Sequence, residues 1–280
     1  MNNEPRIDAL LPADMARKAE YIGVSKSEAP ILSMFSLAVL AGAFIAMGAI
    51  FATTVSAGTA GDWPYGVTRL LAGLVFCLGL ILVIVGGAEL FTGNNLIVMA
   101  WASGKVSTRA MLRNWVIVYA GNFVGSVGTA VLILLSKQYS FGGGAVGKTA
   151  LSIANSKAEL DFFQALVLGI LCNALVCLAV WLTFSARSTM DKIAAIIFPI
   201  TAFVAAGFEH SIANMYFIPI GLFIKAFDPT FTATTGLDLS NLTWGAFLIN
   251  NLIPVTIGNI IGGTVFVAAI YWSIFLRGKK

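Results

Sequence analysis

Long apolar runs constrain the fold of this chain more than any other feature of its sequence. About 20 predominantly apolar residues are needed to cross the hydrocarbon core of a bilayer. Only 11% of the residues are charged, whereas a typical soluble domain has about 25%. The sequence therefore predicts an all-α polytopic membrane protein with six spans. Apolar windows lie near residues 31–55, 69–101, 114–136, 162–185, 193–226 and 244–276.

No linker or change of composition divides the chain, so one transmembrane transport domain is predicted over residues 1–280. Residues 1–30 precede the spans of 31–276, and residues 277–280 form a short tail. Apolar residues recur at helical spacing in the first segment, which predicts an amphipathic helix, either at the membrane surface or solvated. They are Leu11, Met15, Ala19 and Ile22.

The basic residues predict the orientation of the spans. An even number of spans puts both termini on one side, and cytoplasmic loops carry the excess of Lys and Arg. The side that holds the termini would carry twelve such residues and the other side five, so both termini are predicted to be cytoplasmic. The twelve are Arg6, Arg17, Lys18, Lys26, Lys105, Arg109, Arg113, Arg187, Lys192, Arg277, Lys279 and Lys280, and the five are Arg69, Lys137, Lys148, Lys157 and Lys225.

An internal repeat relates the two long runs. Residues 87–94 and 207–214 both read G-x-E-x-x-x-x-N, 120 residues apart. The span that follows each of them contains G-N-x-x-G, at residues 121–125 and 258–262, a pattern that lets helices approach closely. Each half therefore has three spans with a broken middle span, and the odd number inverts the second half relative to the first. This is an inverted-repeat architecture typical of transporters.

The two breaks predict an anion site near the midplane. A helix restarts after each break, near Gly93 and Ser211, and inversion brings the two positive N-terminal ends together. Glu89 and Glu209 lie in the breaks and are costly at membrane depth unless paired. We expect each carboxylate to support its break by accepting hydrogen bonds from exposed backbone N–H groups. A proton relay is the alternative role.

His210 is the one histidine of the chain and lies in the second break. A buried structural histidine is the ordinary interpretation, but an ionisable group within a membrane is a functional candidate, and histidine titrates near neutral pH. Thr92 lies at nearly the matching place in the first break, where it would donate a hydroxyl hydrogen bond or cap the restarted helix. No metal or other cofactor is predicted, since there is no second histidine and the cysteines are not at ligand spacing.

One motif is misleading. Residues Gly142–Thr149 match the phosphate-binding pattern G-x-x-x-x-G-K-[ST]. That motif needs a preceding strand in an α/β domain, whereas here it falls in a predicted loop between two spans. We therefore expect no nucleotide site. The net charge of +4 is confined to short loops and predicts no nucleic-acid partner.

Two segments carry a resemblance to a known family. Residues 85–94 (VGGAELFTGN) and 169–179 (GILCNALVCLA) resemble the two signatures of the formate/nitrite transporter family. The resemblance covers nearly the whole chain. It implies an aquaporin-like fold, a homopentamer with one pore per subunit, and a place in the bacterial inner membrane.

The resemblance also implies roles for single residues, which are carried over by position. Asn173 resembles a pore-side asparagine, and Lys157 resembles a lysine that draws anions toward the pore. Without the resemblance, Phe76 and Phe203 would be interpreted as core residues and Lys157 as a solvated loop charge. The apolar constrictions would comprise Phe76, Leu80 and Phe203 with Leu90 and Val176, and the central polar site Thr92, His210 and Asn214.

The function implied is a channel for formate and related small monovalent anions, with protons and membrane lipid as its other partners. In this hypothesis His210 protonates the anion, which then passes the apolar constrictions as a neutral acid. Nitrite or hydrosulfide are alternative substrates. A water or polyol channel is disfavoured because no Asn-Pro-Ala tripeptide occurs. An intramembrane hydrolase is disfavoured because Ser211 lacks a second catalytic group. The chain is not expected to be an enzyme.

Overall fold

The fold is all-helical in the computed structural model, which describes residues 9–59 and 61–278. The predicted cytoplasmic charges Arg6, Lys279 and Lys280 lie outside these residues. Within the described ranges there is no strand, and five helices are long and apolar enough to cross a membrane. They are α2 (Ile31–Ser56), α3 (Tyr65–Gly86), α6 (Thr108–Ser136), α8 (Phe162–Ser185) and a continuous last helix over Ala246–Phe275, which comprises η3 (Ala246–Leu252), α12 (Ile253–Gly263), η4 (Thr264–Ala269) and α13 (Ile270–Phe275).

Two helix breaks interrupt the second and fifth spans, as the sequence predicts. Gly87 ends α3 with φ at +75°, and Gly207 follows α9 (Thr189–Ala205) with φ at +76°. Glycine adopts this left-handed backbone without steric cost. After the breaks the chain restarts as α10 (Ser211–Phe227) in the second half. In the first half it restarts as α4 (Phe91–Asn94), η1 (Asn95–Ile97) and α5 (Val98–Ala102).

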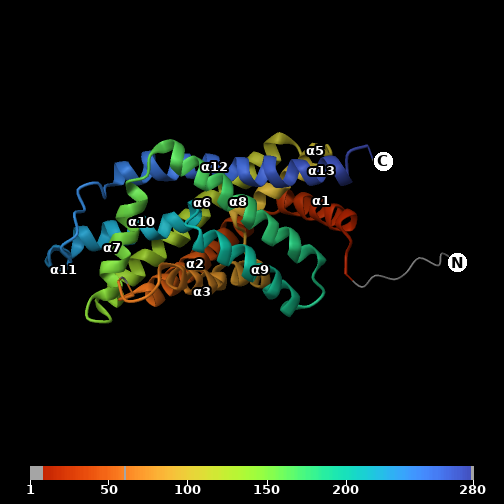
Figure 1. Ribbon diagram of the computed structural model, residues 1–280. Coiled ribbons are helices and arrows are strands. Elements are labelled where there is room, and N and C mark those ends of the chain that lie inside the picture. The colour runs from red at the N-terminus through yellow and green to blue at the C-terminus, as the bar shows by residue number, and fades with distance from the viewer. Residues whose placement is uncertain (1–8, 60, 279–280) are drawn as a thin grey trace.

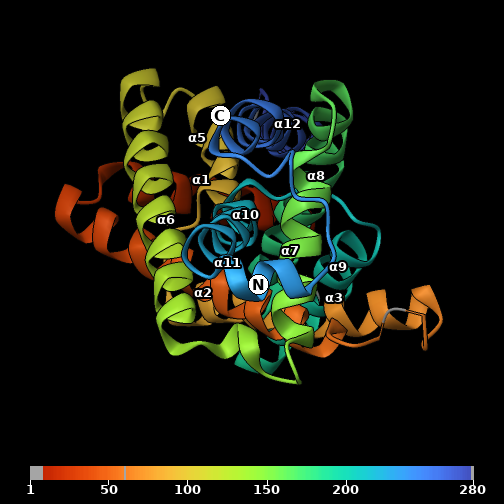
Figure 2. The same ribbon diagram turned by 90° about the vertical axis from the view of Figure 1, so that its left-hand side faces the viewer.

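The two halves are inverted relative to each other. The guanidinium of Arg69, near the start of α3, donates to the carbonyls of Val204 and Ala205 at the end of α9. The equivalent helices α3 and α9 are therefore antiparallel. In each half the first and third spans also pack together, α2 on α6 and α8 on α12. Viewed along the bundle, α10 lies in the middle between α2, α6 and α12 (Figure 2).

Each half begins with a further helix. α1 (Pro12–Glu28) packs on α5, and α7 (Ala145–Ala158) packs on α10. The predicted amphipathic helix thus exists, but it buries Met15 and Ala19 within the protein rather than in lipid or solvent. α1, α5 and α13 lie at one end of the molecule, and α7 and α11 (Pro229–Thr234) at the other (Figure 1).

The segment that matches a phosphate loop is also helical in part, although the sequence predicts only a loop there. It follows a 3-10 turn (η2, Gln138–Ser140) and leads directly into α7. Gly142, Gly143 and Gly144 all have positive φ, which explains this run of glycines as a tight turn before a helix.

The G-N-x-x-G glycines bring the span backbones into close contact. A Cβ atom on Gly125 would lie 1.9 Å from the carbonyl oxygen of Val39, and one on Gly262 would lie 2.2 Å from that of Ile170. Both distances are far inside van der Waals contact with backbone that cannot rotate away. Only glycine therefore permits the α2–α6 and α8–α12 crossings.

We expect Gly125→Ala to lower the thermal stability of the purified protein, because forcing a methyl group into a packed core costs about 1–3 kcal/mol. Gly128→Ala, on the same helix, is the matched control, since among the described residues no atom outside its own stretch of helix lies within 4 Å of its added Cβ. That control should be neutral or stabilising by up to about 1 kcal/mol, given the better helix propensity of alanine. Equal changes in melting temperature would contradict the close-packing argument.

A candidate anion pore

Two cavities approach the middle of the bundle from opposite ends. The α1-side cavity has a volume of about 400 Å³, and the α7-side cavity about 490 Å³. Each contains a break glycine, a break glutamate and the asparagine that closes the repeat motif. The α1-side lining includes Lys26, Leu80, Gly87, Glu89, Leu90 and Asn94, and the α7-side lining includes Phe76, Lys157, Phe203, Gly207, Glu209, His210 and Asn214.

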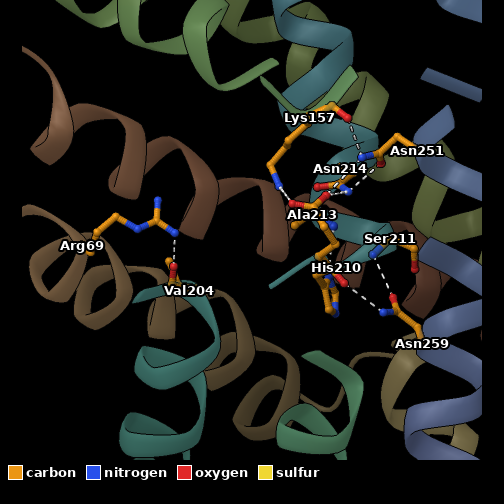
Figure 3. Close-up of polar contacts among 10 residues, drawn as sticks. Arg69, Lys157, Val204, His210, Ser211, Ala213, Asn214, Asn251 and Asn259 are labelled. Atoms are coloured by element: carbon orange, nitrogen blue, oxygen red, sulfur yellow. Dashed lines mark hydrogen bonds and ion pairs between the residues drawn. The ribbon is translucent and has the colours of Figure 1, made fainter. Parts of the chain in front are cut away.

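His210 lies at the inner end of the α7-side cavity, with a relative exposure of only 3%. It is the N-cap of α10, because its Nδ1 accepts the backbone N–H of Ala213 at 3.1 Å (Figure 3). A neutral imidazole with an accepting Nδ1 carries its proton on Nε2. Nε2 therefore donates to Thr92 Oγ1, 3.0 Å away. The two predicted polar residues thus meet directly between the cavities.

Thr92 does not cap its half-helix. Leu90 is the N-cap residue of α4, and its apolar side chain makes no capping hydrogen bond. The hydroxyl of Thr92 is fully buried and is bonded to His210. Of the two roles considered for Thr92, the geometry favours the polar contact with His210.

Apolar side chains surround this polar pair. The rings of Phe76 and Phe203 meet edge to face with centroids 5.7 Å apart, and Phe203 stacks on His210 at 5.9 Å. Leu80 and Leu90 line the end of the other cavity. Four of the predicted constriction residues therefore line one cavity or the other, and of these Phe203 contacts His210. Val176 is buried on α8 and lines neither cavity.

Each break glutamate is held by one lysine and by asparagines. Glu209 accepts from Lys157 Nζ at 2.6 Å and Asn214 Nδ2 at 2.6 Å. Glu89 accepts from Lys26 Nζ at 2.7 Å and Asn94 Nδ2 at 2.6 Å. Both carboxylates are therefore paired, which is the condition for a charge at this depth.

The expectation that the glutamates satisfy backbone N–H groups is wrong in its detail, because asparagines of the G-N-x-x-G motifs do so. Asn122 Oδ1 accepts the N–H of Phe91 at 2.9 Å, and Asn259 Oδ1 accepts the N–H of Ser211 at 2.9 Å. Each asparagine amide also donates to the carbonyl of the break glutamate, at 2.9 Å in both halves. The amide has both a donor and an acceptor, so one asparagine side chain pairs a backbone N–H and a backbone carbonyl. An ionised carboxylate only accepts, so it could not pair the carbonyl.

Sequence reasoning missed Lys26 and misplaced Lys157. Each lysine lies five residues before the first residue of a span helix, α2 or α8, and that shared spacing is the signal that could have paired them. Lys157 lies in the last turn of α7 and is ion-paired, so it is not a free loop charge. The side-chain amides of Asn114 and Asn251 donate to the backbone carbonyls of Lys26 and Lys157, respectively, each at 3.0 Å.

Asn173 is fully buried and lines neither cavity. Its amide donates to Asn95 Oδ1 at 2.7 Å, to the carbonyl of Asn259 at 2.7 Å and to that of Thr92 at 3.3 Å. It thus links α4 and η1 of the first half to α12 of the second half. Its predicted contact with an anion stays a prediction.

Comparisons with known proteins agree with this architecture. Residues 13–273 match the family model described as formate/nitrite transporter. The formate channel FocA of Escherichia coli (strain K12) is 46% identical over 281 residues, which cover 99% of this chain and 98% of that protein. The FocA protein of Haemophilus influenzae (strain ATCC 51907 / DSM 11121 / KW20 / Rd) is 43% identical, with 92% of each chain covered.

A solved structure described as a pentameric formate channel with formate bound has the same fold. Its TM-score is 0.83 at 48% sequence identity, over 88% of this chain and 98% of that one. The family match over residues 13–273 includes both breaks, the residues that line both cavities and the His210–Thr92 pair.

Proposed function

The chain belongs to the formate/nitrite transporter family, and from this membership we propose that it is a channel for formate and related small monovalent anions. The observation that carries the proposal is the His210–Thr92 pair. Its two polar hydrogens are the Nε2–H of His210, which is shared with Thr92 Oγ1, and the hydroxyl hydrogen of Thr92. They lie between two cavities that are lined in part by Phe and Leu side chains. A small anion can be bound by such donors, whereas a larger solute would not pass the aromatic and aliphatic side chains around them.

We further propose a homopentamer in the bacterial inner membrane with both termini cytoplasmic. The solved relative described as pentameric supports the assembly, and the FocA relatives support the bacterial setting. Packing of α1 against α13 supports termini on one side. The excess of Lys and Arg on that side supports the cytoplasmic orientation.

His210 is proposed to exchange a proton with the anion. An ion is costly in an apolar constriction, so a weak acid crosses most easily as the neutral molecule. Reference pKa values of about 6.5 for His and about 3.9 for a carboxylic acid differ by about 2.6, or roughly 3.5 kcal/mol against the transfer in water. Desolvation of two ions costs several kcal/mol each, which offsets that difference. Because Nδ1 accepts from Ala213, charging the imidazole also requires that this capping bond open.

The alternatives receive less support from the geometry. Nitrite or hydrosulfide fit the same donors, so selection among small anions is a matter for flux measurements. For a hydrolase, Ser211 would need a base, but both nitrogens of the neighbouring His210 are already engaged, by Ala213 and by Thr92. A water or polyol channel of aquaporin type would have an Asn-Pro-Ala tripeptide at the start of each half-helix, and this sequence contains none.

We expect proteoliposomes that contain the purified protein to take up formate at least tenfold faster than protein-free liposomes, and glycerol no faster. Stopped-flow light scattering measures both rates, and a peptide-hydrolysis assay on the same preparation tests the enzyme alternative. Formate uptake equal to that of protein-free liposomes would overturn the proposal. Nitrite and hydrosulfide in the same assay would rank the small anions.

A further inference from the structure

The charges that line the α7-side cavity do not include a free lysine. Lys157 and Glu209 form an ion pair at 2.6 Å, so their charges largely cancel. Arg69 also lines this cavity. None of the ion pairs between described residues involves Arg69. Among the described residues that line this cavity, Arg69 is therefore the cation whose charge no carboxylate neutralises.

Arg69 lies at a negative helix end. Its Nε donates to the carbonyl of Ala205 at 3.2 Å, and its Nη2 donates to that of Val204 (Figure 3). α9 ends there because of the break at Gly207, and a helix C-terminus carries a partial charge of about −0.5. The guanidinium has five N–H donors, of which these two bonds use two. The side chain thus donates to two carbonyl oxygens and has three further N–H donors that these two bonds do not use.

Among the described residues, no such cap is found in the first half of the chain. The residues 120 positions earlier are Ile84 and Val85, at the end of α3. Within the described residues, no side-chain donor reaches either carbonyl. The cations Lys18 and Lys192 line the α1-side cavity beside the Lys26–Glu89 pair. The two cavities are therefore equivalent in their Lys–Glu pairs but differ in where their net positive charge comes from.

We infer that Arg69 is a specificity-determining residue of the anion pathway: it supplies the net positive charge of the α7-side cavity and neutralises the carbonyl end of α9. This inference rests on the proposed function, since it concerns access of a monovalent anion to His210. Without Arg69, an anion in this cavity would face the bare carbonyls of Val204 and Ala205 and a cancelled ion pair. Low-dielectric walls focus the field of such a charge and raise the local concentration of the counter-ion.

The charge of Arg69 should make formate flux depend on the ionic strength of the solution on that face. Its effect on an anion in the cavity is screened over about 8 Å at physiological ionic strength. Salt added on the Arg69 face should therefore slow formate flux through the wild-type protein. Salt on the opposite face acts on the other cavity, where Lys18 and Lys192 remain.

The test compares Arg69→Gln and Arg69→Lys in right-side-out and inside-out membrane vesicles, with a salt of large impermeant ions varied only outside. Glutamine keeps a donor for the carbonyls but removes the charge. Lysine keeps the charge but loses the planar guanidinium that donates to both carbonyls. We expect Arg69→Gln to lower formate permeability at low salt roughly 3- to 10-fold and to abolish the salt dependence in one vesicle orientation only. Arg69→Lys should retain most of both.

Lys137→Gln is the matched control, because Lys137 follows α6 beside the end of α2, is exposed, and lines neither cavity. It should leave permeability and salt dependence unchanged. Size-exclusion chromatography checks that each variant assembles as the wild type does. If Arg69→Gln keeps the wild-type salt dependence, or if Arg69→Lys is as impaired as Arg69→Gln, Arg69 is a structural cap and the inference is wrong. If the wild type itself conducts no formate, the proposed function fails first.

Discussion

Replacing His210 by asparagine is expected to abolish the pH dependence of formate flux while the assembled protein stays intact. Asparagine is among the best N-cap residues, so its side-chain oxygen can accept the Ala213 N–H that Nδ1 accepts now. The amide does not titrate, so no proton can pass between residue 210 and the anion. We expect flux near neutral pH to fall about 100-fold, the lower range of what a positioned acid or base contributes. Flux in proteoliposomes between pH 5 and pH 8 measures it.

His210→Phe is the companion variant. It removes the titrating group and the cap together, so it should lose the pH dependence equally and in addition lose about 1 kcal/mol of stability. Glu209 and Lys157, the nearest charged partners of this break, are retained in both variants. A His210→Asn protein with wild-type flux and an unchanged pH profile would rule out proton exchange at His210.

Much of the fold could be predicted because an apolar chain can adopt only a few kinds of fold within a membrane. The length of the runs gives the spans, and an unpaired backbone is so costly in lipid that only helices can cross it. The two breaks were visible because Gly87 and Gly207 stand beside carboxylates within apolar runs. The inversion then follows from three spans per half and is confirmed by the contact of Arg69 with the end of α9.

The partners within the site could be predicted only in part. Glu89 and Glu209 were identified from their cost in lipid, but the sequence places nothing beside them. Lys26 and Lys157 come from helices outside the spans, and charged residues outside apolar runs ordinarily face solvent. The contact between His210 and Thr92 depends on how the halves dock, since 118 residues separate them. Local periodicity carries no information on such a distance.

Replacing Asn259 by leucine is expected to cause the largest loss of stability. Its side chain accepts the Ser211 N–H and donates to the Glu209 carbonyl, each at 2.9 Å. Leucine has nearly the same size but leaves both backbone groups buried and unpaired, at about 1–3 kcal/mol each. We therefore expect the folded protein to lose about 2–6 kcal/mol, seen as a large drop in the temperature at which the purified assembly dissociates and aggregates in detergent.

The inverted repeat supplies an internal comparison for this experiment. Asn122→Leu removes the same two kinds of bond in the first half and should cost as much as Asn259→Leu. Asn241→Leu changes the same residue type at an exposed position and should leave the transition temperature within a degree or two. The asparagines support the breaks only if both buried variants lose stability and the exposed one does not. A stable Asn259→Leu protein would mean that water or a rearranged carboxylate replaces the amide there.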